Sequence, residues 1–451
     1  MSDARPSILP TSTIFAYCLP STGLGLVMML FSIYLMKFST DVLLIAPAAM
    51  GTLLGLGRFW DAVSDPVAGY LSDRTMSRSG RRRTWMLASA VPLAATFVMV
   101  WAPPEALTGF ALILWMGAAL FAFETASTAF AIPYGALGLE LTTAYHERTR
   151  LFAYRHVLQA IGALLGLGGV YLLRTAAVPR TMAFWVSLFA GVAMATAIGI
   201  AVTRLREPLA HQGRGSVRIT KAFADVFRNE PGRLLFVVYG IETFGMTSVT
   251  MLSPYIMQYI VLAPDLTEAL ILVYFLPQVG LTPLWVRLAR RFGKKKLWLM
   301  AMVFQAAGFF AMFWVGEDGY VLLFVILFLI GVGGGCSLVV APAIQADVVD
   351  YDEFLTHERK EGAYFAIWNM IRKGAFGVGA ILTGTLLQWV GFQPNVEQTE
   401  TTRTAMLALV GILPGACYLA GALLFTRFGL NEPEHAAIAA ELEARSPPGA
   451  G

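Results

Sequence analysis

The chain has 451 residues, of which 57% are hydrophobic and only 14% are charged. Soluble proteins carry about 25% charged residues, so this composition excludes an ordinary soluble enzyme. With 33 Lys and Arg against 29 Asp and Glu, the net charge of +4 is too small to indicate a nucleic acid partner. The apolar residues instead form runs of about 20 or more, each long enough to cross a bilayer as a helix.

Taken in chain order, the apolar runs predict about twelve transmembrane helices. The runs are continuous and far longer than the roughly 9–11 alternating residues of a barrel strand, which favours helices. The first run is too long for the apolar part of a signal peptide, so we expect a span and not a cleaved leader. The predicted spans are residues 12–37, 44–72, 85–103, 107–137, 151–174, 181–203, 233–261, 267–289, 297–315, 320–347, 362–390 and 404–427.

Lys and Arg concentrate in alternate junctions between the predicted spans. Residues 74–83 and 290–296 are rich in basic side chains, whereas the other junctions carry mainly acids such as Asp41, Glu105 and Asp318. The positive-inside rule then places both termini in the cytoplasm, which agrees with an even number of spans.

Internal similarity divides the chain into two halves. Residues 78–85 (RSGRRRTW) return at 291–298 (RFGKKKLW), 213 positions later, and the His-Glu-Arg of 146–148 returns 211 positions later. Basic loops can look alike by composition, but the nearly shared offset argues against coincidence. Parallel duplication of a six-helix unit is typical of the major facilitator superfamily. We therefore predict an all-α membrane protein with an N-terminal six-helix bundle at 1–204, a cytoplasmic linker at 205–232, a C-terminal six-helix bundle at 233–430 and a cytoplasmic tail at 431–451.

The second predicted span carries three charged residues, Arg58, Asp61 and Asp65, on one helical face. Charged groups inside a membrane are costly and usually face a partner or a water-filled path. Two carboxylates one turn apart, partly neutralised by Arg58, form a site that accepts one proton or one small cation. The alternative is a structural Arg–Asp ion pair that holds the span against its neighbours.

The fourth predicted span adds Glu124 and Thr128 to this region. The Thr128 hydroxyl is suited to supply an oxygen to a cation held by the two aspartates. Without an Arg or a metal, the Glu124 carboxyl is expected to be protonated and suited to proton exchange. The alternative is a protonated Glu that bonds a neighbouring helix.

Arg155, Glu242 and Lys373 are further charged residues within predicted spans. Arg155 and Lys373 come from opposite halves and are placed to attract an anionic or hydroxylated substrate in a central cavity. Alternatively, Lys373 pairs with Asp61, Asp65 or Glu242 and replaces a cation. The predicted substrate-binding residues are Ser21, Arg58, Arg155, Glu242, Trp368, Asn369 and Lys373.

The remaining motifs give no sign of a metal site or a cofactor site. Cys18, Cys336 and Cys417 lie inside predicted spans without a CxxC pair or nearby His, so neither a disulfide framework nor a zinc site is implied. The glycine-rich run at 331–335 lacks the Lys-Ser/Thr of a phosphate loop, which favours close helix packing or a flexible point.

In the segments given at the end of this paragraph, the chain resembles the glycoside–pentoside–hexuronide:cation symporters, the melibiose-permease-like branch of the major facilitator superfamily. The resemblance covers both halves. It implies alternating access in a bacterial inner membrane, with Asp61, Asp65 and Thr128 as the coupling-cation site and with Arg155 and Lys373 as cavity-lining basic residues. The matching segments are 58–66 (RFWDAVSDP), 69–75 (GYLSDRT), 80–83 (GRRR), 132–134 (IPY), 140–142 (ELT), 145–150 (YHERTR), 346–353 (ADVVDYDE) and 372–374 (RKG).

Three positions depart from the pattern of the sugar-transporting members. Ser21 stands where those members have an Asp, Ala131 stands where melibiose permease has an Asp, and Gly135 replaces an aromatic of that permease that offers a stacking surface. A melibiose-type specificity is therefore not expected. We hypothesise that Glu124 supplies the charge missing at Ala131 and favours proton coupling over sodium coupling.

Charge clusters at the predicted cytoplasmic ends have two interpretations. They either anchor the protein to lipid phosphates or, as the resemblance implies, lock the inner face when the cavity opens outward. The predicted cytoplasmic gate consists of Asp73, Arg74, Arg81, Glu140, Arg148, Arg150, Asp347 and Asp350.

The sequence thus predicts a monomeric secondary symporter, coupled to Na⁺ or H⁺, for a small polar solute such as a sugar, glycoside or sugar acid. The alternative is a transporter of a lysolipid-like or amphipathic substrate, because the losses at Ser21 and Ala131 make the cavity more apolar. An enzyme is not expected, since the five dispersed histidines form no catalytic cluster. A channel is not expected either, because a two-fold repeat does not build a pore ring.

Overall fold

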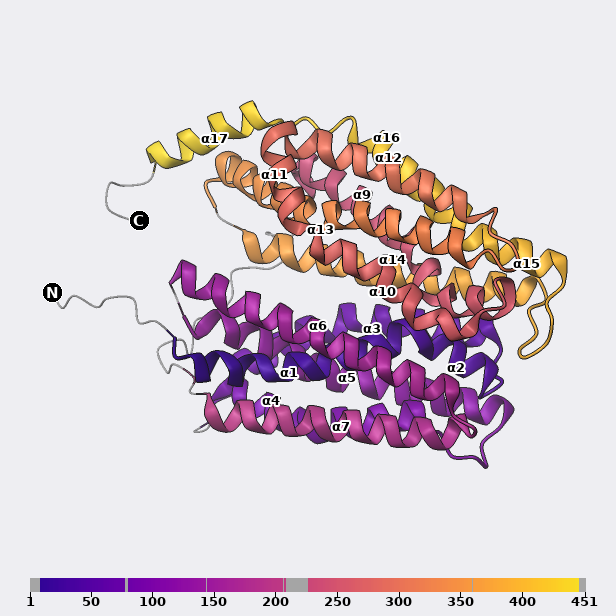
Figure 1. Cartoon of the computed structure of the whole chain (residues 1–451). Helices are drawn as coiled ribbons and strands as arrows, with labels where there is room; N and C mark the ends of the chain where they lie inside the picture. The colour runs from indigo at the N-terminus through magenta and orange to yellow at the C-terminus, as the bar shows by residue number, and fades with distance from the viewer. Residues whose placement is uncertain are drawn as a thin grey trace. The chain divides into compact units, whose positions relative to one another are not determined.

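The computed structural model describes residues 9–77, 80–142, 144–205, 207, 226–358 and 360–445. Within these ranges the regular structure is entirely helical. The chain divides into two compact units, Met1–Gly215 and Ser216–Gly451, called here the first and the second unit. Figure 1 shows helices α1 to α7 in the first unit and α9 to α17 in the second.

In the first unit, α1 packs against α6 and α7, α4 against α5 and α7, and α3 against α5. The contact between α1 and α6 is close because glycines form it: a Cβ at Gly25 would overlap the backbone of Gln159, and one at Gly162 would overlap that of Thr22. The elements are α1 (Thr11–Met29), η1 (Leu30–Tyr34), α2 (Leu35–Asp41), α3 (Pro47–Arg74), α4 (Arg81–Trp101), α5 (Gly109–Glu140), α6 (Tyr145–Thr175) and α7 (Pro179–Arg204).

In the second unit, α9 packs against α14 and α16, while α12 packs against α13 and α16, and α10 against α13. The C-terminal helix α17 packs on α13. The elements are α9 (Glu230–Tyr255), η3 (Ile256–Ile260), η4 (Pro264–Leu266), α10 (Thr267–Gly280), α11 (Thr282–Phe292), α12 (Lys294–Met312), α13 (Tyr320–Thr356), α14 (Glu361–Trp389), α15 (Glu400–Leu407), η5 (Ala408–Ile412), α16 (Leu413–Phe425) and α17 (Glu432–Arg445).

Eight helices of the described residues are long and apolar enough to cross a membrane, and a pair bent by 49° at Leu281 makes up to nine. Three other long helices, α3, α12 and α14, are not among them. Charged residues lower the hydropathy of these helices: α3 contains Arg58, Asp61 and Asp65, and α12 begins with three lysines. The number of twelve spans and the cytoplasmic termini therefore stay predictions.

Parts of the predicted linker and of the predicted tail belong to the two folded units. Most of the predicted linker at 205–232 lies outside the described residues, but Glu207 is described and its side chain is only 2% exposed. The helix α9 begins at Glu230, earlier than the predicted span, after Asn229 accepts a bond from the Gly232 amide. In the predicted tail at 431–451, residues 432–445 form α17.

Candidate functional site

Arg58, Asp61 and Asp65 lie on one face of α3, as their spacing predicts, and this face meets α5. The Arg58 guanidinium lies 3.4 Å from an Asp61 carboxylate oxygen on its own helix and 3.1 Å from a Glu124 oxygen on α5. Asp61 and Glu124 are buried, with 2% and 5% of their surfaces exposed. Arg58 therefore links the carboxylates of two helices. This geometry fits both interpretations of the residues, a structural ion pair and an ion-binding site.

This arrangement changes the interpretation of Glu124. The expectation that its carboxyl is neutral required that no Arg lie nearby, and Arg58 is at ion-pair distance. A cation at this distance favours the charged carboxylate, so the argument for proton exchange at Glu124 loses its basis. Its role in ion binding stays a prediction.

Thr128 and Asp65 lie together, one turn further along the same two helices. The Thr128 hydroxyl donates to an Asp65 carboxylate oxygen at 2.9 Å, and the Ser64 hydroxyl donates to Thr128 at 3.3 Å. Ser64 was missed in the sequence, although it lies in the same motif and places a third oxygen in this group. The hydroxyl and carboxylate oxygens are ligands suited to Na⁺.

The described contacts form two pairs along the two helices. Among the described residues, no group of three or more His, Cys, Asp or Glu is arranged to hold a metal ion. The described geometry therefore associates Thr128 with Asp65, and Glu124 with Arg58.

Ser21 and Arg155 belong to a second polar group, between α1, α5 and α6. Ser21 is fully buried, and its hydroxyl lies 2.7 Å from that of Tyr134. The Tyr134 ring stacks on Tyr17 with centroids 4.7 Å apart, and the Arg155 guanidinium lies 4.8 Å from the Tyr134 centroid. In this conformation the Ser21 hydroxyl is engaged inside the unit, so a substrate contact there requires the Ser21–Tyr134 bond to open.

The predicted substrate residues of the second unit lie on α9 and α14. The Trp368 ring stacks on Tyr239 at 3.7 Å between centroids, so one ring face is already covered. Asn369 accepts a bond from Arg372 at 3.3 Å. The alternative pair of Lys373 with Glu242 is not formed, because no cation among the described residues pairs with Glu242. The predicted approach of Arg155 to Lys373 joins the two units and stays a prediction.

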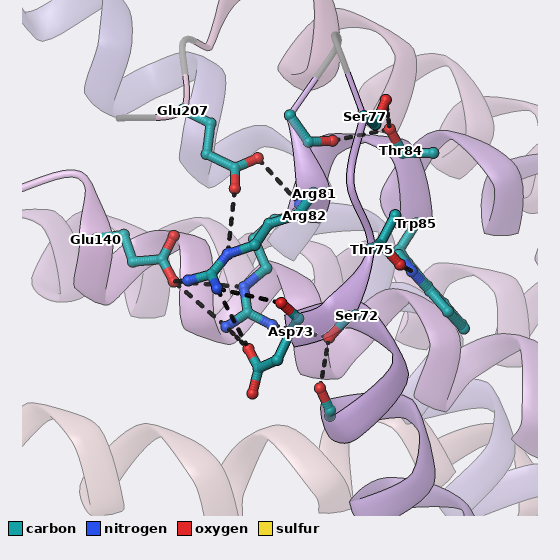
Figure 2. Close-up of polar contacts among 12 residues, drawn as sticks. Ser72, Asp73, Thr75, Ser77, Arg81, Arg82, Thr84, Trp85, Glu140 and Glu207 are labelled. Carbon is teal, nitrogen blue, oxygen red and sulfur yellow. Dashed lines mark hydrogen bonds and ion pairs between the residues drawn. The ribbon is translucent and has the colours of Figure 1, made fainter. Parts of the chain in front are cut away.

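Arg81 and Arg82, at the start of α4, form the centre of the predicted gate in the first unit. Figure 2 shows both guanidinium groups between Glu140 and Asp73, with Glu207 approaching from the other side. Arg81 donates to Glu140 at 2.8 Å and lies 3.9 Å from Asp73, and Arg82 pairs with the same two carboxylates. The predicted group of Asp73, Arg81 and Glu140 is thus brought together.

Arg82 belongs to the basic run at 81–83 that the sequence places in the cytoplasmic charge cluster, whereas Glu207 was missed. One Glu207 oxygen accepts from the Arg82 backbone amide at 3.0 Å, and the other lies 3.5 Å from Arg81 Nε. An acid at the exposed amides of a helix start is favoured by the helix dipole. A signal exists: residues 205–208 (LREP) and 430–433 (LNEP) share a Leu-x-Glu-Pro pattern after the last long helix of each unit.

The other predicted gate residues of the first unit make local contacts. The Arg74 guanidinium lies over the Tyr70 ring at 4.2 Å. Arg148 donates to backbone carbonyl oxygens at the C-terminal end of α5, at 3.4 and 3.5 Å. Arg150 pairs with Glu147 at 3.4 Å. These contacts position the helix ends around the central cluster.

Asp347 and Asp350, the predicted gate residues of the second unit, lie on α13. Lys294 bonds both Asp347 oxygens at 2.7 Å. His435 of α17 lies 3.2 Å from Asp350 and 3.5 Å from Asp347. The second unit therefore also gathers acids around the start of a basic helix, with α17 completing the group.

A family model described as MFS/sugar transport protein matches residues 16–432 of the chain. The chain belongs to this family. The resemblance to the glycoside–pentoside–hexuronide symporters is thereby confirmed, and the MFS/sugar transport protein is a multi-pass protein of the bacterial inner membrane.

Relatives of this MFS/sugar transport protein match it almost end to end. It is 26% identical to the glucuronide carrier protein homolog of Escherichia coli (strain K12), over 96% of this chain and 95% of that protein. It is 27% identical to the isoprimeverose transporter of Lactiplantibacillus pentosus, over 96% and 94%. It is also 27% identical to a putative sulfoquinovose importer of Escherichia coli (strain K12), over 99% and 97%.

Solved structures of other transporters confirm the fold of this chain. The D-xylose-proton symporter matches with a TM-score of 0.71 at 14% identity, over 93% of this chain and 98% of that chain. The nucleoside transporter NupG matches with a TM-score of 0.69 at 14% identity, over 92% and 98%. The predicted major facilitator fold is therefore confirmed.

Proposed function

We propose that the chain is a symporter that uses an Na⁺ or H⁺ gradient to move a sugar, glycoside or sugar acid by alternating access. The main observation behind this proposal is the hydrogen bond between Thr128 and Asp65, beside Asp61, in a chain that belongs to a sugar-transport family. The relatives named for a glucuronide, isoprimeverose and sulfoquinovose support a solute of this class. The chain works as a transporter and catalyses no reaction.

The coupling cation is bound by oxygens of Asp61, Asp65 and Thr128. Arg58 lies at ion-pair distance from Asp61 and Glu124, and the Thr128 hydroxyl bonds Asp65, so the two helices bring together the carboxylate and hydroxyl oxygens that a monovalent cation prefers. Because Thr128 already bonds Asp65, a bound cation has a hydroxyl and a carboxylate oxygen adjacent to each other. No resident metal or cofactor takes part besides this coupling ion.

The solute is bound by Arg155 in the first unit and by Trp368, Asn369 and Lys373 in the second, with Ser21 and Arg58 nearby. Arg155 and Lys373 suit an anionic or hydroxylated solute because a guanidinium and an ammonium both donate to carboxylate and hydroxyl oxygens. A lysolipid-like solute is the second candidate. Gly135 favours such a solute. An added Cβ there would meet no described atom within 4 Å, so no aromatic side chain lies against this position.

The charged clusters act as gates at the cytoplasmic side. Asp73, Arg81 and Glu140 in the first unit, and Asp347 and Asp350 in the second, lock the inner face and release it once per cycle. Their neighbours Arg74, Arg148 and Arg150 position the helix ends. The protein works as a monomer in the lipid bilayer, with both termini in the cytoplasm and without a nucleic acid partner.

Uptake into proteoliposomes tests the proposal. The probes are methyl β-glucuronide, isoprimeverose, sulfoquinovose and lysophosphatidylcholine, each with an imposed Na⁺ gradient, an imposed pH gradient or neither. We expect gradient-driven uptake of at least one of the three sugars. Accumulation of the lysolipid alone would favour the second candidate, and uptake that ignores both gradients would overturn symport.

Two threonines of α5 give a matched pair of variants. Thr128→Val removes the hydroxyl beside Asp65 and is expected to raise the cation concentration for half-maximal uptake about tenfold, the value of about one charge-assisted hydrogen bond. Thr125 bonds Trp60 at 2.9 Å and lies outside the cation site, so Thr125→Val is the control. Equal cation dependence of the two variants would remove Thr128 from the site.

A further inference from the structure

Glu242 is a buried carboxyl in the middle of α9 in the second unit. Only 6% of its surface is exposed, and its Oε1 atom has no hydrogen-bond partner among the described residues. Moving an isolated carboxylate out of water is far more costly than moving a neutral carboxyl. An acid in this environment therefore needs a cation or a proton.

Within the described residues of the second unit, no cation meets this need. On α14, Arg372 acts electrostatically on Tyr239, one turn before Glu242, but neither Arg372 nor Lys373 pairs with the acid. The other titratable side chains that face this region are Tyr239 on α9, Tyr274 on α10, Cys336 on α13, and Cys417 and Tyr418 on α16. None of these carries a positive charge in any protonation state, so within the second unit a proton is the ion that remains.

The packing between α9 and α16 keeps the Glu242 side chain inside the bundle. A Cβ at Gly421 on α16 would lie 3.7 Å from Glu242 Cγ, so a glycine provides the room for the acid there. Tyr418, one turn earlier on α16, is also buried, with 7% of its surface exposed. The helix that packs against Glu242 therefore carries a second buried polar side chain.

The glycine-rich run of α13 extends this polar region. A Cβ at Gly334 would lie 2.9 Å from the Gln278 amide nitrogen, 3.6 Å from the Tyr274 hydroxyl and 3.7 Å from the Gln305 amide oxygen. Gln305 is 1% exposed, and Gln278 lies 3.4 Å from the Tyr274 hydroxyl. Three polar side chains from α10 and α12 therefore converge on a position that only glycine leaves open.

We propose that Glu242 is a proton-binding site of the second unit, and that the proton it binds and releases is a coupling ion of the symport proposed above. Tyr418, Tyr274, Gln278 and Gln305 form the polar region through which the acid exchanges its proton with water. The site is additional to the cation site at Asp61 and Asp65. The proton comes from water on one side of the membrane as Glu242 becomes neutral, and returns to water on the other side as the carboxylate re-forms.

Glu124 and Glu242, both buried within predicted spans, differ in what balances their charge. Glu124 has Arg58 at 3.1 Å and is balanced as a carboxylate, whereas Glu242 has no such partner among the described residues. Infrared difference spectroscopy separates these states, because only a protonated carboxyl gives a carboxylic acid C=O band. Glu124 is therefore the matched control.

The first experiment records this band at neutral pH with the full chain in lipid nanodiscs and no solute. We expect the band to be lost in Glu242→Gln and kept in Glu124→Gln. Tyr418→Phe keeps the acid and changes its neighbour, so it is expected to shift the band without removing it. A band that neither Glu242→Gln nor Tyr418→Phe alters overturns the proposal.

The second experiment tests coupling with whichever of the sugar probes the wild type carries. Glu242→Gln permanently mimics the protonated acid. Net uptake driven by a pH gradient is therefore expected to fall roughly tenfold or more. Exchange of internal for external sugar is expected to persist, because it needs no net movement of protons. Equal loss of both activities overturns the coupling role. If the wild type carries none of the probes, the proposed function fails, while the infrared band still decides whether Glu242 holds a proton.

Discussion

Gly80 before α4 and Gly293 before α12 occupy corresponding places in the two units. Their backbone angles are nearly the same, with φ of 96° and ψ of 143° at Gly80 and φ of 78° and ψ of 148° at Gly293. Each glycine precedes a basic residue, Arg81 or Lys294, that reaches an acid on another helix of its unit. The duplicated sequence has therefore kept one backbone turn in both halves.

The side chains around the two turns have diverged. In the first unit Arg81 and Arg82 are 6% and 7% exposed and share Glu140, whereas in the second unit the Lys294 side chain is 38% exposed and has one main partner, Asp347. Buried arginines that share a carboxylate hold several charge-assisted bonds in fixed directions, but an exposed lysine can move. We infer that the first cluster is the rigid one and that the second is the more easily opened.

The largest expected effect comes from breaking the turn itself. Gly80→Ala places a Cβ against the Glu207 carboxylate in a backbone region that is nearly restricted to glycine, so we expect a loss of about 2–3 kcal/mol in stability. At Gly293 the nearest atom is a Glu432 oxygen at 3.4 Å, and Gly293→Ala is expected to cost about 1–2 kcal/mol. Thermal unfolding in detergent measures both, and a larger loss for Gly293→Ala would contradict the comparison.

A smaller effect is expected from exchanging the basic residues. Arg82→Lys keeps the charge but loses the fork that bonds Ser72 at 2.8 Å together with Glu140, at a cost of about 1–3 kcal/mol. Lys294→Arg changes an exposed pair and is expected to stay within about 0.5 kcal/mol of the wild type. Thermal unfolding again provides the measurement. If the two exchanges shift the midpoint equally, the first cluster is no more rigid than the second.

The comparison also shows which parts of the molecule the sequence could predict. The position of Arg58, Asp61 and Asp65 on one face followed from helical spacing, and the pairing of Asp65 with Thr128 followed from the same depth in two spans. Spacing along one helix does not give the direction from which another helix approaches. The partner of Glu124 depends on how α3 crosses α5, and so the approach of Arg58 was not foreseen.

Contacts made by segments outside the spans were the hardest to predict. Glu207 and His435 follow the last long helix of their units, where apolar periodicity gives no signal, yet both complete a charged cluster. The burial of Ser21 was also missed, because the stacking of Tyr17 on Tyr134 arises only when α1 and α5 pack. The repeated Leu-x-Glu-Pro pattern is the one sequence feature that pointed to Glu207.

The smallest expected effect is at the contact of α17 with the second cluster. His435→Ala removes the contacts to Asp347 and Asp350, which lie partly exposed at 3.5 and 3.2 Å, so we expect a change below about 1 kcal/mol in overall stability. The local effect is larger than the global one, because α17 packs mainly on α13. Digestion by a protease that cuts after Glu reports on this, since Glu441 lies within α17.

The matched control for this variant is Arg403→Ala, which breaks an ion pair at 2.5 Å between Arg403 of α15 and Glu317, away from α17 in the same unit. We expect faster cleavage in α17 for His435→Ala and an unchanged rate for Arg403→Ala. In the first unit, Glu207 bonds the backbone amide at the start of α4 and holds no separate terminal helix, so no such release is expected there. Equal cleavage rates for wild type and His435→Ala would mean that apolar packing alone holds α17, and the second cluster would then be as fixed as the first.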